Sequence, residues 1–177
     1  MPIPDRLAAS LAELGMTPTC HEHPPLRTVE DAHAIWDSLP GAQVKNLFIK
    51  DAGQQYWLVV VPGDPRMDTK AMARLIGSKR ISFGSADELR AILDVEPGSV
   101  TPLALMNDAR HQVRLVIHAG LMAAATLLVH PLVNTATLEM TPGELQRFLV
   151  HHGVIPALVD LRPAFVEEDL ISSRGKS

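Results

Sequence analysis

The sequence predicts a single α/β domain built around a mixed, partly antiparallel sheet. Its 177 residues fit one domain, and 46% of them are hydrophobic, which is enough for a buried core. Helical and strand patterns interleave irregularly along the chain, and residues 44–64 have the pattern of a hairpin. No repeat or low-complexity linker divides the sequence. We therefore expect residues 1–166 to form one domain and residues 167–177 to form a polar, flexible tail.

Five segments have the pattern of helices. Leucines recur at helical spacing in the first segment, which ends before Gly15. Thr28 and Asp31 can cap the second, and Ser85 forms a capping box with Glu88 at the start of the fourth. A glycine follows the third segment, and a threonine precedes the last. The expected ranges are 4–14, 28–39, 68–76, 85–94 and 141–153.

Eight segments have the pattern of strands. The clearest two are VKNLFIKD and QYWLVVVPGD, which form the arms of the hairpin around a turn at 51–54. The second arm is almost continuously apolar, so we expect it to be covered on both faces of the sheet. The other strands are expected at 18–23, 81–83, 114–118, 125–129, 135–140 and 154–159.

Lys45 opens the first arm of the hairpin. Strand alternation places it on the same side as Leu47 and Ile49, which suits a face that lines a pocket with Lys45 at its rim. Strand ends also commonly place lysines in solvent. Alternation alone therefore leaves two interpretations open, a solvated lysine and a lysine held for chemistry.

Composition excludes several functional classes. A net charge of −4 argues against broad binding to polyanions, although it leaves room for a local basic patch that holds one RNA end. Cys20 is the single cysteine, so no internal disulfide can form, which is typical of a reducing compartment. The N-terminus lacks the pattern of a signal peptide, and no stretch approaches the ~20 apolar residues of a membrane helix. We expect a cytoplasmic protein with no membrane contact.

Metal and nucleophile motifs are weak. The histidine pairs at 21/23 and 151/152 lack the spacing of known zinc patterns, so we expect no metal and no cofactor. The loop at 98–102, GSVTP, is not a GxSxG nucleophile elbow because Pro102 replaces the last glycine. A loop of this kind can still present backbone N–H groups to an oxyanion or a phosphate.

Three motifs in order resemble the YbaK/ProX family of prolyl-tRNA-synthetase-associated editing domains. They are Lys45-Asn46 at the start of the hairpin, the GSVTP loop at 98–102, and HPLVNTAT at 130–137. The similarity covers about residues 3–161. Within the family, the Lys45-Asn46 pair and the HPLVNTATL segment most resemble the free-standing alanyl-tRNA(Pro) deacylase.

The resemblance implies a fold and an activity. The fold is a compact α/β domain with a mostly antiparallel, barrel-like sheet surrounded by helices. The activity is that of a hydrolase, a trans-editing aminoacyl-tRNA deacylase that cleaves the ester of mischarged Ala-tRNA(Pro). In this reaction the 2′-hydroxyl of the substrate ribose assists the attack of water. The implied partner is the acceptor end of tRNA(Pro), with prolyl-tRNA synthetase or an elongation factor as transient partners, and no metal takes part.

The resemblance also implies roles for single residues. Lys45 corresponds to the essential lysine, and Asn46 to its neighbour in the pocket. His130 helps to form the amino-acid pocket, and Thr28 is a weaker candidate for its rim. The residues beside the substrate carbonyl are Gly98, Ser99, Val100, Thr101 and Pro102.

Physical chemistry favours Lys45 as a cation. The reference pKa of a lysine side chain is about 10.4, so at pH 7 only about one in 2,500 is neutral and able to act as a base. A cation that positions phosphate, adenosine or the ester oxygen needs no such tuning. For tRNA contact, the best local basic cluster in the sequence is Lys70, Arg74, Lys79 and Arg80.

Two alternatives remain open. The same chemistry can act on another mischarged tRNA, such as cysteinyl- or seryl-tRNA. The chain can also be a binding module that holds tRNA or synthetase without catalysis.

Overall fold

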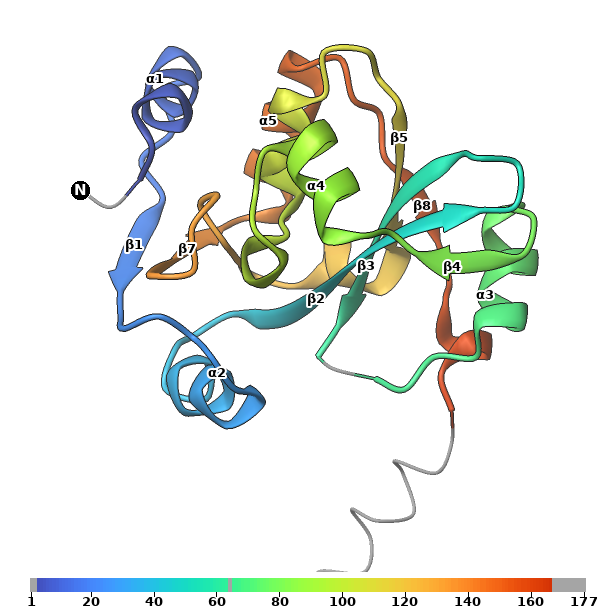
Figure 1. The fold of residues 1–177 in the computed structure, drawn as a ribbon. Coiled ribbons are helices and arrows are strands. Elements are labelled where there is room, and N and C mark those ends of the chain that lie inside the picture. The colour runs from blue at the N-terminus through green and yellow to red at the C-terminus, as the bar shows by residue number, and fades with distance from the viewer. Residues whose placement is uncertain (1–2, 64, 167–177) are drawn as a thin grey trace, which may run out of the picture.

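The computed structural model describes residues 3–63 and 65–166, and this part of the chain forms a mixed sheet with helices on both faces (Figure 1). The expected tail at 167–177 lies outside the described residues. The helices are α1 (Asp5–Glu13), α2 (Val29–Trp36), α3 (Thr69–Ile76), α4 (Ala86–Leu93) and α5 (Pro142–His151). The strands are β1 (Thr19–Glu22), β2 (Ala42–Asp51), β3 (Tyr56–Pro62), β4 (Ile81–Phe83), β5 (Val113–His118), β6 (Leu127–Val129), β7 (Ala136–Met140) and β8 (Ala157–Val159).

The sheet mixes both directions of pairing. Its strand order is β1-β7-β6-β2-β3-β5-β8, and β4 pairs with β2 beside this path. Among the described residues, the antiparallel pairs are β1/β7, β6/β7, β2/β3 and β2/β4, and the parallel pairs are β2/β6, β3/β5 and β5/β8. The single α/β domain with a mixed sheet surrounded by helices is therefore confirmed.

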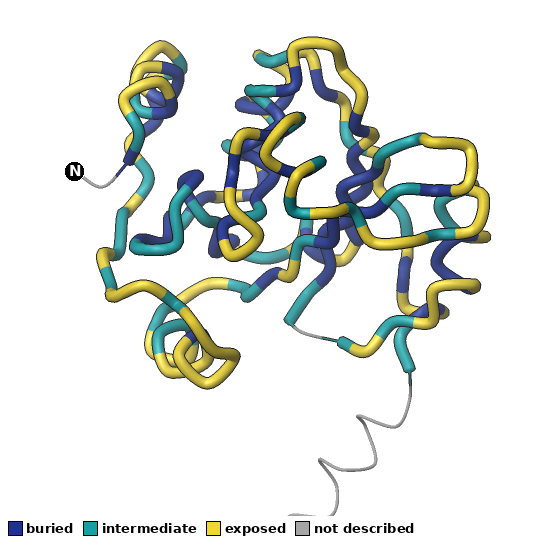
Figure 2. Tube along the Cα trace, viewed as in Figure 1, coloured by how far each residue is buried: buried dark blue, intermediate teal, exposed yellow. Residues whose placement is uncertain are grey.

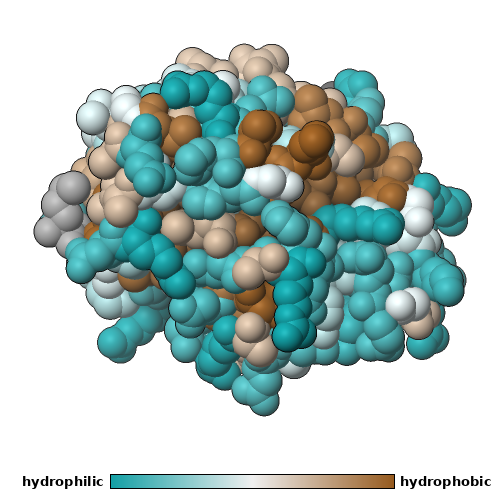
Figure 3. Space-filling model, turned by 90° about the horizontal axis from the view of Figure 1, so that it is seen from above, coloured by the Kyte–Doolittle hydropathy of each residue, from teal (hydrophilic) through white to brown (hydrophobic). Residues whose placement is uncertain are grey.

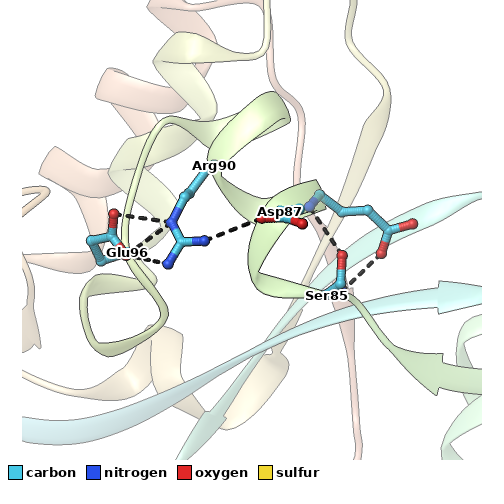
Figure 4. Close-up of polar contacts among 5 residues, drawn as sticks. Ser85, Asp87, Arg90 and Glu96 are labelled. Atoms are coloured by element: carbon cyan, nitrogen blue, oxygen red, sulfur yellow. Dashed lines mark hydrogen bonds and ion pairs between the residues drawn. The ribbon is translucent and has the colours of Figure 1, made fainter.

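Side-chain caps fix where the helices begin. Thr28, Ser85 and Thr141 each accept a hydrogen bond from the third residue of their helix, whose carboxylate bonds back to the cap. These capping boxes satisfy N–H groups that a helix start leaves without partners. Around the α4 box, Arg90 lies between Asp87 and Glu96 on the helix surface (Figure 4). The second helix is shorter than the expected range of 28–39, since α2 ends at Trp36.

The core has two parts, one on each face of the central strands. Along β3, Leu58 and Val60 pack towards α1, α4 and α5, while Trp57, Val59 and Val61 pack towards α3. The central strands are buried, whereas α2 is largely exposed (Figure 2). The expectation that the second hairpin arm is covered on both faces is confirmed.

The surface seen from above Figure 1 is mixed, with hydrophobic side chains gathered on one side and hydrophilic ones over the rest (Figure 3). Large hydrophobic side chains that remain exposed include Ile155 before β8 and Val150 in α5. Within residues 3–63 and 65–166, no helix has the length and apolar character needed to cross a membrane.

Candidate active site

A cavity of about 340 Å³ lies where β2 begins. Five separate parts of the chain form its walls: the segment leading into α2 with α2 itself, the start of β2, Gly63 after β3, the loop before residue 101, and His130 after β6. Its lining residues are Leu26, Arg27, Thr28, Val29, Ala32, His33, Trp36, Val44, Lys45, Asn46, Gly63, Pro97, Gly98, Val100 and His130.

The start of β2 brings Val44, Lys45 and Asn46 to the cavity. Lys45 is exposed, whereas Val44 is buried and packs with the core that faces α4 and α5. The expectation that Leu47 and Ile49 line the pocket with Lys45 is wrong. Both residues are buried in the second core, where they pack with residues of α3, and neither lines the cavity.

Asn46 fastens the loop to the strand. Its Nδ2 donates to the carbonyl oxygen of Val100 at 3.0 Å. Its Oδ1 is buried and has no hydrogen-bond partner among the described residues. Since a buried oxygen without a donor is costly, this side of Asn46 favours a ligand that carries N–H groups.

The loop at 98–102 divides into two parts. Gly98 and Val100 line the cavity. Ser99, Thr101 and Pro102 do not line it, and all three residues are buried. Thr101 instead caps the 3₁₀ helix Pro102–Asn107 by accepting from the Leu103 N–H. The Ser99 N–H donates to the Glu96 carbonyl at 2.9 Å, so that amide is already used.

His130 is an uncharged wall of the cavity. Burial lowers the pKa of its imidazole, an effect that His23 reinforces and a backbone contact with Ala136 opposes. Its Nδ1 is buried without a hydrogen-bond partner among the described residues. The ring lies 6.2 Å from that of Trp36, centroid to centroid, so α2 and the loop after β6 meet here.

The wall contributed by α2 was not foreseen from the sequence, apart from Thr28 at its start. Val29, Ala32 and Trp36 line the cavity, and they are spaced three and four residues apart, on one face of the helix. This spacing is visible in the sequence and could have indicated a helix face that lines a pocket. In the structure only Ala32 of this helix is buried in the core. The other lining residues missed from the sequence are Leu26, Arg27, His33, Val44, Gly63 and Pro97.

The four basic residues expected to contact tRNA do come together. Lys70, Arg74, Lys79 and Arg80 line a shallow groove between α3 and β4. This groove is separate from the cavity, since α2 and α3 lie at opposite ends of the molecule (Figure 1). The two sites lie towards opposite ends of β2, which begins beside the cavity and ends next to Arg80, whose carbonyl accepts from Ala52 N–H at 2.9 Å.

The histidines at 21/23 and 151/152 all lie within hydrogen-bond distance of other side chains of the protein. His21 Nε2 lies 3.1 Å from a carboxylate oxygen of Glu139, and His23 Nε2 lies 2.9 Å from the Thr137 hydroxyl. Among the described residues, no group of three histidine, cysteine or acidic side chains is placed to hold a metal ion.

Comparison with known proteins gives consistent matches over most of the chain. Prolyl-tRNA editing protein ProX of Acetoanaerobium sticklandii is 35% identical over 146 residues, which are 82% of this chain and 89% of that protein. Prolyl-tRNA synthetase associated domain-containing protein 1 of Xenopus laevis is 37% identical over 158 residues, covering 86% of this chain and 94% of that protein. A proline–tRNA ligase of Bacillus licheniformis is 28% identical over 102 residues, only 18% of its own length.

Solved structures and a family model agree with these relatives. The crystal structure of hypothetical protein APE2540 superposes with a TM-score of 0.68 at 26% identity, covering 88% of this chain and 99% of that one. A second structure, of a candidate trans-editing enzyme for prolyl-tRNA synthetase, has a TM-score of 0.67 at 21% identity and supports the fold. The model of the aminoacyl-tRNA editing domain matches residues 23–148. The chain therefore belongs to the aminoacyl-tRNA editing domain family.

Proposed function

We propose that this protein hydrolyses the ester that joins alanine to the terminal adenosine of mischarged tRNA(Pro). One observation carries the proposal. The cavity brings Lys45 and Asn46 of β2, Gly98 and Val100 of the loop, and His130 together in one small space. Relatives named as prolyl-tRNA editing proteins direct the choice of tRNA.

In the proposed reaction, water attacks the ester carbonyl and the C–O bond to the ribose breaks. The ribose oxygen leaves with a proton, and the products are alanine and uncharged tRNA. The cavity offers no cysteine or serine nucleophile among its lining residues. The 2′-hydroxyl of the substrate is then the group best placed to position or activate the water.

Lys45 acts in this proposal as a fixed cation. It is exposed at the rim, which suits contact with the terminal phosphate, the adenosine or the ester oxygen. Lys45→Ala should reduce kcat/KM for Ala-tRNA(Pro) at least about 100-fold, and Lys45→Arg should recover part of it because the charge is kept. Equal rates for the wild type and Lys45→Ala contradict the role.

The oxyanion donors in this proposal are backbone amides of the loop. Since the Ser99 amide is already bonded to Glu96, the donors are those of Gly98 and Val100, which line the cavity. A well-aimed amide of this kind stabilises the transition state by about 3 kcal/mol.

Three walls set the size limit in this proposal: Asn46, Val100 and His130. A missing methylene is worth only ~1–3 kcal/mol, so a site shaped for proline cannot strongly reject alanine, whereas a site too small for proline can remove alanine selectively. An uncharged His130 also avoids repelling the substrate α-ammonium. Val100→Ala should let prolyl-tRNA(Pro) enter, and continued exclusion of proline by all enlarging variants contradicts this assignment.

The groove between α3 and β4 is proposed to hold the acceptor stem. Its four basic side chains form a local positive patch on a protein whose net charge is −4. Replacing Lys70 and Arg74 by glutamate should raise KM while leaving kcat nearly unchanged. An unchanged KM refutes the groove as a tRNA contact.

Two rival functions are tested by the same assays. If cysteinyl- or seryl-tRNA is deacylated faster than alanyl-tRNA(Pro), the same chemistry acts on another mischarged tRNA. Tight tRNA binding with no turnover of any ester, unaffected by Lys45→Ala, would make the chain a binding module. Cytoplasmic action, and transient contact with prolyl-tRNA synthetase or an elongation factor, follow from the proposed substrate.

A further inference from the structure

One side chain is bonded to one wall of the cavity and lies next to another without lining the cavity itself. Asn134 lies in the loop between β6 and β7. Its Nδ2 donates to the carbonyl oxygen of Leu26 at 3.3 Å. The same nitrogen lies 3.4 Å from the position that a Cβ on Gly98 would occupy. Leu26 and Gly98 both line the cavity, whereas Asn134 does not.

The Leu26 wall belongs to a segment with little buried surface, since residues 27–31 are all exposed. It leads into α2, where only Ala32 is buried in the core. A segment with little buried apolar surface is held by a small number of interactions, so each of them has a large influence on its position. The bond from Asn134 is one of these interactions, and it ties the segment to the loop that carries His130.

The loop that presents Asn134 is itself strained. Leu132 has a φ of 68°, in the left-handed region that bulky residues rarely adopt, and its side chain is buried. Such a conformation persists only where the surrounding packing imposes it. On its far side the loop joins β1, since the His23 N–H donates to the Thr135 carbonyl at 3.0 Å. The loop is therefore anchored well enough to serve as a fixed reference for the walls.

We infer that Asn134 is a positioning residue that sets the width of the aminoacyl cavity by fixing the Leu26 wall against the Gly98 wall. The inference rests on the proposed function and names a residue that determines its specificity. Without the amide, the Leu26 segment loses its tie and the cavity widens, so discrimination between alanyl and prolyl esters falls although no group that touches the substrate has changed.

Two variants test this inference. Asn134→Asp keeps the shape but replaces the donor with an oxygen that faces the Leu26 carbonyl, and Asn134→Ala removes both the bond to Leu26 and the amide beside Gly98. The matched control is Asn107→Asp, because Asn107 Nδ2 makes the same kind of bond to the Leu93 carbonyl, at 2.8 Å, and does not line the cavity. Thermal melting checks that every variant is folded.

The measurement is kcat/KM for alanyl- and prolyl-tRNA(Pro) with each variant. We expect the ratio of kcat/KM for the alanyl ester to that for the prolyl ester to fall at least about tenfold in both Asn134 variants. A tenfold change corresponds to the discrimination that about one methylene provides. In the control, the ratio should stay within about twofold of wild type. A double-mutant cycle with Gly98→Ala should show coupling between the two positions, because a methyl on Gly98 points at the Asn134 amide.

The outcomes separate the inference from the function on which it rests. If the wild type hydrolyses alanyl-tRNA(Pro) and folded Asn134 variants keep the wild-type ratio, the positioning role is wrong and the proposed function stands. If the wild type hydrolyses neither ester, the proposed function is wrong. Affinities for non-hydrolysable alanyl- and prolyl-adenosine amides give a second readout, which should shift towards the prolyl compound only in the Asn134 variants.

Discussion

Glu88 makes three hydrogen bonds, of which two join α4 to the sheet and one caps the helix. Its carboxylate accepts from Lys50 Nζ at 2.6 Å, from the Tyr56 hydroxyl at 2.8 Å and from the Ser85 N–H at 2.8 Å. Lys50 and Tyr56 belong to β2 and β3, and Ser85 caps α4. We predict that Glu88→Gln weakens the first two bonds and keeps the third, since glutamine also serves in a capping box.

The size of the effect follows from the lost charge. Hydrogen bonds to an ionised group contribute about 1.5–3 kcal/mol, and the Glu88 side chain is 25% exposed, which reduces that value. A loss of about 1.5 kcal/mol lowers the Tm of a domain of this size by about 3–6 °C. Thermal or chemical denaturation at pH 7 measures this difference directly.

The pH dependence gives a second and independent test. The Lys50 ammonium, the Ser85 amide and the Tyr56 hydroxyl lower the pKa of Glu88 to about 2 from an ordinary value of 4.5. Because the folded state binds the proton less readily than the unfolded state, the stabilisation is complete above pH 4.5 and is lost as the pH falls towards 2. The gap in stability between wild type and Glu88→Gln should therefore shrink over this interval.

Glu96→Gln is the matched control. Glu96 pairs with Arg90 on the surface of α4, and both side chains are well exposed, so the variant should melt close to the wild type (Figure 4). The proposed strength of the Glu88 hydrogen bonds is refuted if Glu88→Gln loses no more stability than the control at pH 7. It is also refuted if the stability difference between wild type and Glu88→Gln stays constant down to pH 3.

Three further predictions concern stability. Gly41→Ala should cost about 1–3 kcal/mol, because Gly41 has a φ of 115° and a Cβ there would lie 2.8 Å from Thr126 Oγ1. Gly84→Ala should cost a similar amount, because its Cβ would collide with the buried Phe48 ring. Burial lowers the pKa of His152, so the unfolded state binds its proton more readily and stability should fall as the pH drops below 6.5, with a weaker dependence in His152→Gln.

Denaturation midpoints check all three. Gly143→Ala is the control for the glycine variants, because a Cβ at that position meets nothing within 4 Å. Glycine variants as stable as this control contradict the two steric predictions. Equal pH dependence of stability in wild type and His152→Gln between pH 7 and 5 contradicts the third.

The sequence allowed the local parts of this fold to be predicted. The helix caps at Thr28, Ser85 and Thr141 and the hairpin turn at 51–54 depend on residues a few positions apart, and all are present. The parallel pairing of β5 with β3 and β8 was not predicted, because it joins segments far apart in sequence.

The candidate site shows the same division. Lys45, Asn46, Gly98, Val100 and His130, which the sequence resemblance singled out, all line one cavity. Strand alternation could not show which face of β2 the cavity adjoins, because both faces are covered by apolar side chains. Likewise, the motif at 98–102 could not show that its second, fourth and fifth residues are buried, since this depends on packing against the following 3₁₀ helix.

We propose that the cavity at the start of β2 removes alanine, and not proline, from tRNA(Pro). The most direct measurement is the single-turnover deacylation rate of one tRNA(Pro) preparation charged with alanine, proline, cysteine or serine. We predict that the alanyl ester is cleared fastest, that the prolyl ester is left intact, and that Lys45→Ala abolishes the difference. Clearance of alanyl and prolyl esters at equal rates, or of neither, would contradict this proposed specificity.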